Sequence, residues 1–117
     1  IKNGNKDDTL CIIEKLNMNS FLDNEISTYS DGMLKKLSIL LSFIGGPRII
    51  LLDEPFITID QASLSALFEI IREYVKRKIS FIISSHEKDM YIRKLIFDEY
   101  FLFKNKKIET SGKFPRY

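Results

Sequence analysis

Two short apolar runs, separated by one long amphipathic stretch, constrain the fold of this chain more than any other feature. Ile49 to Leu52 is a continuous apolar run that is too short for a helix and does not alternate with polar residues. It predicts a parallel strand that is buried on both faces. Ile79 to Ser84 predicts a second buried strand. Strand, crossover helix and strand form a βαβ unit, so the predicted fold class is α/β.

Two amphipathic stretches predict the helices around these strands. Asp60 can cap the helix between the strands, and the apolar face of that helix is Leu64, Leu67, Phe68, Ile71 and Val75. Ser30 precedes an earlier helix that Gly45-Gly46-Pro47 ends. The apolar residues of this earlier helix, three, four and three positions apart, predict its buried face: Leu34, Leu37, Leu41 and Ile44.

The two ends of the sequence give weaker patterns. Residues 1–6 are polar and are expected to be loose, and a helix is expected from Asp7, with Leu10, Ile13 and Leu16 on its apolar face. Residues 87–95 predict a short helix. Two strands, 100–103 and 107–110, are expected around a turn at residues 104–106.

Composition excludes some classes of protein. The formal net charge of +2, from 18 Lys and Arg against 16 Asp and Glu, gives no argument for a nucleic-acid partner. The single cysteine, Cys11, allows no internal disulfide and is expected to be buried. The sequence has no apolar stretch long enough for a membrane span of its own and no visible signal peptide. A reducing, cytoplasmic compartment is therefore expected.

Polar residues that could do chemistry follow both predicted strands. Asp53 and Glu54 end the first strand, and His86 follows the second. The carboxyl ends of parallel strands meet at one edge of the sheet, where α/β proteins bind ligands. Two acids suit phosphoryl transfer, since one can hold Mg²⁺ while the other polarises the attacking water. A neutral His86 could hydrogen-bond a phosphate oxygen or that water. The alternatives are a solvated strand end and a surface histidine.

A second group of candidates surrounds the two predicted helix starts. Ser30-Asp31-Gly32 opens a helix whose free N–H groups favour an anion, and Gly32 lets backbone come close. The alternative is a simple serine cap. Asp60 can combine a capping role with a functional one. The neighbouring Lys35-Lys36 pair is expected to lie on a solvated helix face.

In order along the chain, these segments resemble the ABC-type ATPase domain. Tyr29 to Met33, "YSDGM", resembles the signature LSGGQ, and Ile49 to Glu54 resembles the Walker B strand with its catalytic glutamate. Thr58 to Asp60 resembles the D-loop, and His86 resembles the switch histidine. The spacings also fit. Tyr29 and Met33, the first and last residues of this segment, resemble those at the same positions in the nucleotide-binding subunits of bacterial exporters.

The resemblance implies roles for these residues. Asp53 would organise Mg²⁺, Glu54 would orient and polarise water, and His86 would contact the γ-phosphate of ATP. Two such domains pair head to tail in this family, so Asp60 would cross the dimer interface. Ser30 and Gly32, with Asp31 and Met33 in the same turn, would bind the partner's ATP. A transmembrane permease subunit would be the other partner, placing the protein on the cytoplasmic face of the membrane.

Departures from the family pattern limit what the resemblance implies. Asp31 stands where the signature usually has its first glycine, and no GxxxxGK[ST] phosphate loop occurs. The chain is therefore interpreted as the C-terminal half of a P-loop NTPase (ABC-type) domain, with parallel strands, crossover helices, part of the helical subdomain and a β-hairpin. Residues 1–46 would be the helical subdomain fragment with the signature, and 47–117 the C-terminal part of the ATP-binding core. This half alone is expected to be inactive.

Three other functions stay open at this stage. A DNA-repair ATPase of the same type would carry a long coiled coil before the signature, whereas residues 1–27 show a short helix and a polar loop. An ABC-type translation factor typically has Asn-His before the Leu-Asp of its D-loop region, and this chain has Ile57-Thr58-Ile59 before Asp60. A degenerate module that only pairs with an ATPase would not need Asp53, Glu54 and His86, so their presence argues against this alternative without excluding it.

Overall fold

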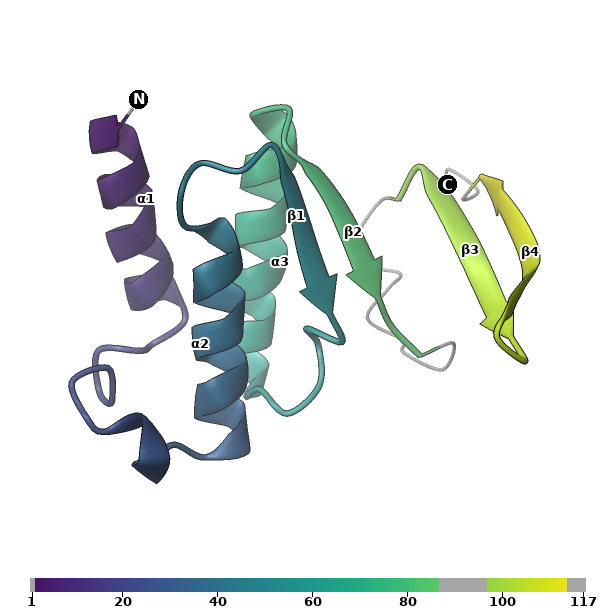
Figure 1. Ribbon diagram of the computed structural model, residues 1–117. Coiled ribbons are helices and arrows are strands. Elements are labelled where there is room, and N and C mark those ends of the chain that lie inside the picture. The colour runs from purple at the N-terminus through teal and green to yellow at the C-terminus, as the bar shows by residue number, and fades with distance from the viewer. Residues whose placement is uncertain (1, 87–96, 114–117) are drawn as a thin grey trace.

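The computed structural model describes residues 2–86 and 97–113, which form helices packed on a parallel strand pair and a separate hairpin (Figure 1). The predicted helix at residues 87–95 lies outside the described residues. In chain order the elements are α1 (Lys2–Lys15), the 3₁₀ turn η1 (Ile26–Thr28), α2 (Asp31–Phe43), β1 (Ile49–Asp53), α3 (Gln61–Lys76), β2 (Ser80–Ser84), β3 (Glu99–Lys104) and β4 (Lys107–Lys113).

The predicted βαβ unit is confirmed. Strands β1 and β2 pair in parallel, with Ile49 opposite Ser80 at one end and Asp53 opposite Ser84 at the other. Helix α3 makes the crossover, and Asp60 caps it by accepting a hydrogen bond from the Ser63 N–H at 3.0 Å. Because both strands end at the same level, the residues that follow them start from one edge of the sheet.

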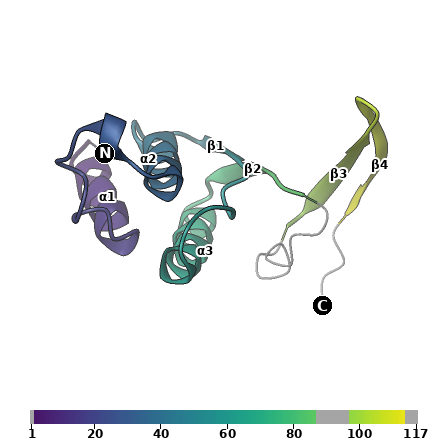
Figure 2. The ribbon, with the colours of Figure 1, turned by 90° about the horizontal axis from the view of Figure 1, so that it is seen from below.

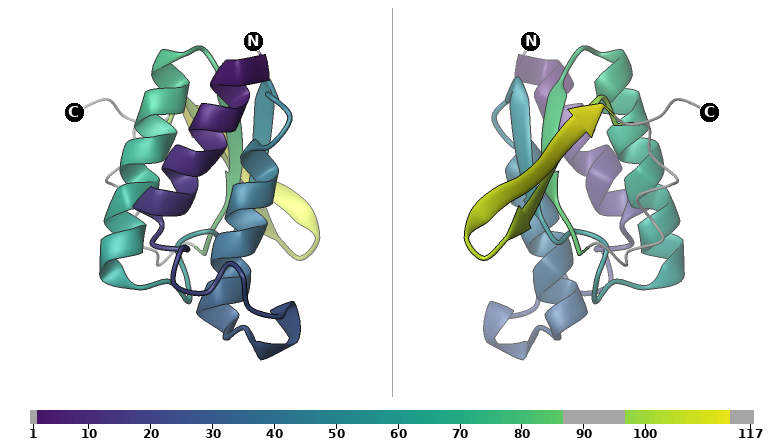
Figure 3. Two further views of the ribbon diagram at one scale, coloured as in Figure 1. Left: turned by 90° about the vertical axis from the view of Figure 1, so that its left-hand side faces the viewer. Right: turned by 90° about the vertical axis from the view of Figure 1, so that its right-hand side faces the viewer.

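All three α-helices lie on one face of the β1–β2 sheet, as the two side views and the view from below show (Figures 2 and 3). Ile50 and Leu52 of β1 point into the core beneath the helices. Ile49 and Leu51, which alternate with them, are exposed, as is Ile82 of β2. The prediction that these strands are buried on both faces is therefore wrong within the described residues, because nothing among them covers the second face.

Helix α1 is longer than predicted and is rotated relative to the predicted face. It begins at Lys2 rather than near Asp7, so residues 2–6 are helical instead of loose. Asp8 pairs at 2.9 Å with Arg77, the residue that follows α3. Ile12, Ile13 and Leu16 are buried, whereas Leu10 is exposed. Cys11 is exposed too, contrary to expectation.

Helix α2 buries a different face from the predicted one. Leu34, Leu41 and Ile44 are exposed, and Leu37 is the member of the predicted face that packs against the core, partly buried. The buried residues are Lys36, Ile39, Leu40 and Phe43. Phe43 lies edge-on to Tyr74 of α3, with 4.8 Å between ring centroids, and also contacts Phe81 of β2. The aromatic contact turns the helix so that the row containing Phe43 is buried, and the polar Lys36 comes with that row.

The remaining boundaries agree with the sequence in outline. Gly45 and Gly46 follow α2 with φ of 92° and 65°, values that glycine adopts readily, so the predicted helix end is confirmed. In α3 the buried row ends at Tyr74, while Val75 is exposed. The predicted hairpin is confirmed with longer strands, and Asn105 and Lys106 form its turn with positive φ.

One hydrophobic core joins the helices to the sheet. It includes Leu16 and Met18 near the end of α1, Ile50 of β1 and Leu67 of α3, all of which are almost fully buried. Residues from both sides of the expected boundary between 46 and 47 contribute to this core, and the division into residues 1–46 and 47–117 stays a prediction. None of the helices in the described residues is long and apolar enough to cross a membrane.

The one-sided sheet predicts that neighbouring leucines respond oppositely to the same substitution. Leu51 is 65% exposed and Leu52 is 4% exposed. Leu51→Thr should change the free energy of unfolding by less than about 0.5 kcal/mol and should reduce self-association of the isolated chain, because it removes apolar surface. Leu52→Thr should destabilise by roughly 2–4 kcal/mol. Urea unfolding and sedimentation velocity measure both. A monodisperse parent chain, or equal destabilisation by the two variants, would contradict this account of the sheet.

Candidate functional site

The carboxyl edge of the sheet brings together the three residues that the sequence placed there. Asp53 is the last residue of β1, Glu54 follows it, and His86 lies two residues beyond β2. The His86 Nε2 atom lies 3.2 Å from Glu54 Oε1. The predicted proximity of His86 to the acids is thus confirmed, and it follows directly from the parallel register of the two strands.

Glu54 combines an unusual backbone with a sheltered side chain. Its φ of 47° is in the left-handed region, which a non-glycine residue adopts at a cost of about 1–3 kcal/mol. The backbone therefore turns sharply after β1. Its Oε2 atom is buried and accepts no hydrogen bond from the described residues. A buried carboxylate oxygen of this kind calls for a polar partner, and it is available to a bound water or ligand.

Ser84 belongs to the same cluster, although it was not among the site residues predicted from the sequence. Its hydroxyl donates a hydrogen bond to Asp53 Oδ1. The Glu54 N–H donates to the Ser84 hydroxyl at 3.0 Å and to the Ser84 carbonyl at 3.1 Å. Ser84 therefore holds the carboxylate of Asp53 and the backbone of Glu54. The signal was available in the sequence, since equal-length parallel strands place a terminal hydroxyl opposite a terminal acid.

The turn at Ser30 to Met33 is a well-formed helix start. The Ser30 hydroxyl accepts a hydrogen bond from the Met33 N–H at 3.2 Å, and the Ser30 N–H donates to the Met33 sulfur at 3.4 Å. Asp31 is the first residue of α2 and is exposed. At this position its negative charge interacts favourably with the helix dipole. The serine cap is thus confirmed, and anion binding by Ser30, Asp31, Gly32 and Met33 stays a prediction.

Gly32 is required by a neighbouring loop as well as by any ligand. A Cβ atom built on Gly32 would lie 2.6 Å from the carbonyl oxygen of Thr58, which is closer than real Cβ contacts allow. Thr58 itself has a φ of 66°. The first turn of α2 therefore packs directly against the segment that joins β1 to α3. The close approach expected of Gly32 is to the protein's own backbone.

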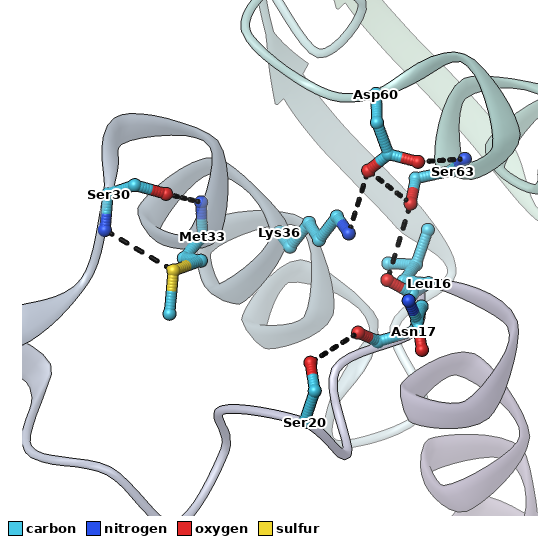
Figure 4. A network of polar contacts seen from close by, with 8 residues as sticks. All are labelled: Leu16, Asn17, Ser20, Ser30, Met33, Lys36, Asp60 and Ser63. Atoms are coloured by element: carbon cyan, nitrogen blue, oxygen red, sulfur yellow. Dashed lines mark hydrogen bonds and ion pairs between the residues drawn. The ribbon is translucent and has the colours of Figure 1, made fainter.

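Asp60 is held from two sides, as Figure 4 shows. Its Oδ1 atom lies 2.9 Å from the Lys36 ammonium and accepts the Ser63 hydroxyl at 2.8 Å. Its Oδ2 atom accepts the Ser63 N–H. The hydrogen bond from Lys36, helped by those from Ser63 against partial desolvation, holds the pKa of Asp60 well below its usual value of 3.8.

Lys36 is the largest departure from the predicted site. It was expected on a solvated helix face, yet it is only 7% exposed. Its ammonium also lies 5.9 Å from the centroid of the Phe21 ring. Lys35 extends instead towards the sheet edge and donates to the Asp53 carbonyl at 3.2 Å. Helical spacing alone could not distinguish these neighbouring lysines.

Comparison with known sequences points to one family. A family model described as ABC transporter matches residues 2–57. The chain is 36% identical over 67 residues to ABC transporter A family member 8 of Arabidopsis thaliana, and 40% identical over 78 residues to the human glucosylceramide transporter ABCA12. It is 29% identical over 89 residues to the probable ABC transporter ATP-binding protein p29 of Mycoplasma genitalium.

The chain covers only part of each relative. It spans 7% of the Arabidopsis protein, 3% of the human protein and 36% of the Mycoplasma protein. These alignments include 57%, 67% and 75% of this chain, respectively.

Solved structures share the fold. An ATP-binding subunit of an ABC transporter superimposes with a TM-score of 0.81 at 20% identity, covering 97% of this chain and 46% of its own. The ATP-binding cassette MJ0796, solved as a dimer in a post-hydrolysis state with ADP and Pi, gives 0.72 at 18% identity and covers 90% of this chain and 46% of its own.

The Lys36–Asp60 pair predicts a specific acid response. The folded state favours the ionised form of Asp60, so this carboxylate stabilises the fold above about pH 3.8, and its contribution is lost as the pH falls further. Asp60→Asn should lower the free energy of unfolding at neutral pH and flatten its decline below pH 3.8. Urea unfolding across this range measures both effects. Gln61→Ala, the exposed neighbour without a charge, should keep the parent's acid slope; an unchanged slope in Asp60→Asn would refute the assignment.

Proposed function

Because this chain belongs to the ABC transporter family and carries part of its ATP-binding domain, we propose that the protein containing it binds and hydrolyses ATP to move a substrate across a membrane. The pairing of Glu54 with His86 beside Asp53 is the observation that carries the proposal. Hydrolysis of a phosphoanhydride needs a carboxylate to orient water and a donor near the transferred phosphoryl group, and this edge supplies both residue types.

Each residue of the sheet edge has a distinct role in this proposal. Glu54 orients and polarises the attacking water through its buried Oε2 atom. His86 Nε2 has a single hydrogen-bonding position, so it would exchange its contact with Glu54 Oε1 for one with the γ-phosphate when nucleotide binds. Ser84 keeps Asp53 and Glu54 in place through its hydroxyl and carbonyl. Positioning of this kind supplies much of the rate in phosphoryl transfer, where little covalent chemistry is asked of the protein.

The residues at the edge fit a magnesium ion that is shared with a nucleotide. Asp53 is exposed at the end of β1 and offers carboxylate oxygens, which Mg²⁺ prefers. In residues 2–86 and 97–113, no group of three or more His, Cys, Asp or Glu residues could hold a metal ion. Asp53 would therefore hold Mg²⁺ together with phosphate oxygens and water, and the bound ion would neutralise phosphate charge.

The turn at Ser30 to Met33 and Asp60 are proposed to act across a dimer. Ser30 and Gly32, with Asp31 and Met33 beside them, bind the γ-phosphate of ATP held by a second ATP-binding domain, and Asp60 lies near the head-to-tail interface. The solved dimer of MJ0796 with ADP and Pi supports this arrangement by analogy of fold. A transmembrane permease subunit completes the assembly at the cytoplasmic face of the membrane. The resemblance of Tyr29 and Met33 to exporter subunits favours export.

Two observations bear on the alternatives. The relatives named above are transporters or a probable transporter component, which supports transport over DNA repair or translation. A non-catalytic pairing module would not need the Glu54–His86 contact or the Ser84 hydrogen bonds that hold both acids. Absence of ATP turnover in the full-length protein would favour such a module.

Glu54→Gln tests the catalytic role in the full-length protein that contains this chain. The amide keeps the size of the side chain and loses its charge, so turnover should fall by roughly 10²–10⁴-fold while ATP binding persists. Steady-state phosphate release and equilibrium nucleotide binding measure the two effects. Glu69→Gln, an exposed acid on α3, is the matched control and should be as active as the parent. Near-normal turnover in Glu54→Gln would remove Glu54 from the role of base.

The isolated 117 residues should neither bind ATP tightly nor hydrolyse it. They contain a Walker B-like strand and a signature-like turn but no GxxxxGK[ST] loop, whose backbone N–H groups would cradle the phosphates. Isothermal titration calorimetry with Mg²⁺ and ATP measures this, with the full-length protein as the positive control. Micromolar affinity in the isolated chain would show that another part of it binds the phosphates.

A further inference from the structure

The segment that joins β1 to α3, Glu54 to Asp60, is held in a conformation that its own residues do not favour. Glu54 and Thr58 both have positive φ, at 47° and 66°. Non-glycine residues keep such conformations only where the surrounding structure imposes them. Pro55 and Phe56 anchor the middle of the segment, since both are buried and the Phe56 ring packs on Phe68 of α3. The two ends of the segment need other restraints.

Helix α2 supplies those restraints through residues of its first two turns. At the start of the segment, Lys35 donates to the Asp53 carbonyl at 3.2 Å. In its second half, Gly32 packs so closely on the Thr58 carbonyl that a side chain would not fit. At its end, Lys36 pairs with Asp60 at 2.9 Å. One side of α2 therefore follows the segment from Asp53 to Asp60.

Of these three residues of α2, Lys36 depends most on its partner in the segment. Lys36 is a buried charged residue, whereas the Asp60 side chain is 56% exposed. A buried ammonium needs a carboxylate partner, so Lys36 fixes where Asp60 must be. The Ser63 hydroxyl, which also contacts Asp60 Oδ1, continues the network to the Leu16 carbonyl beyond α1, as Figure 4 shows. Asp60 is thereby tied to two helices besides its own.

We propose that Lys36 is a positioning residue for Glu54: by holding Asp60 against α2, it fixes the Glu54–Asp60 segment and couples the Ser30–Met33 turn to the carboxylate at the sheet edge. This role requires no direct contact of Lys36 with Glu54 or with the free N–H groups of the Ser30–Met33 turn. Lys36 acts through the segment between them. The catalytic part of this proposal rests on the proposed function, whereas the restraint of the segment does not.

Lys36→Met in the full-length protein tests the coupling, because it removes the charge and keeps a side chain of similar length against Phe21. Arg77→Met is the matched control, since it removes another ion pair of 2.9 Å, with Asp8, away from the segment. In Lys36→Met, kcat should fall about 10- to 100-fold with little change in the KM for ATP. Amide hydrogen exchange at residues 54–60 should accelerate at least about tenfold, because the segment loses one of its restraints. Arg77→Met should change neither.

Two further variants keep the test decisive. Lys36→Arg retains the positive charge and should restore most of kcat. If Lys36→Met does not fold, Asp60→Asn replaces it, since asparagine still caps α3 while losing the charge that Lys36 needs. Unchanged exchange at residues 54–60 in the folded charge-removing variant overturns the proposal. So does a fall in melting temperature with parental kcat, which would make the pair purely structural. If the parent hydrolyses no ATP, the proposed function fails, and faster exchange at residues 54–60 still supports the restraint.

Discussion

The parallel register of β1 with β2 is the constraint on which the candidate site depends. Because Asp53 lies opposite Ser84, both strands end together, and the next residues of each strand leave from one edge. The Glu54 N–H then donates to the hydroxyl and the carbonyl of Ser84, and His86 reaches the Glu54 carboxylate. A shift of one residue would place Ser84 opposite the wrong neighbour and would separate its hydroxyl from the Asp53 carboxylate and the Glu54 N–H. The crossover helix α3 makes this parallel pairing possible.

The same architecture explains which sequence-based predictions were correct. Motifs that depend on local chemistry were located well: the apolar run of β1, the caps at Ser30 and Asp60, and the glycines that end α2. Each is determined by residues within a few positions of itself. The meeting of Glu54 and His86 was also predictable, because parallel pairing is a simple rule that carries a local pattern across the fold.

Predictions of which face is buried failed where the choice depended on distant partners. Helix α2 has two apolar rows, and contacts of Phe43 with Tyr74 and Phe81 decide which of them is buried. The buried row includes Lys36 because Asp60, from another element, neutralises it. Strand β1 reads as buried on both faces, yet the described helices cover one. No periodicity within a single segment contains this information, since it belongs to pairs of segments.

Asp31 and Gly32 show how an unusual signature can be accommodated. The family pattern has glycine at both positions, and this sequence has aspartate at the first. Asp31 is exposed at the start of α2, where its side chain has room and its charge suits the helix dipole. Gly32 has no such freedom, because Thr58 occupies the space that a Cβ atom would need. The two signature positions therefore differ physically. The first tolerates a side chain in this fold, whereas the second must stay a glycine because α2 packs there directly against the segment from Glu54 to Asp60.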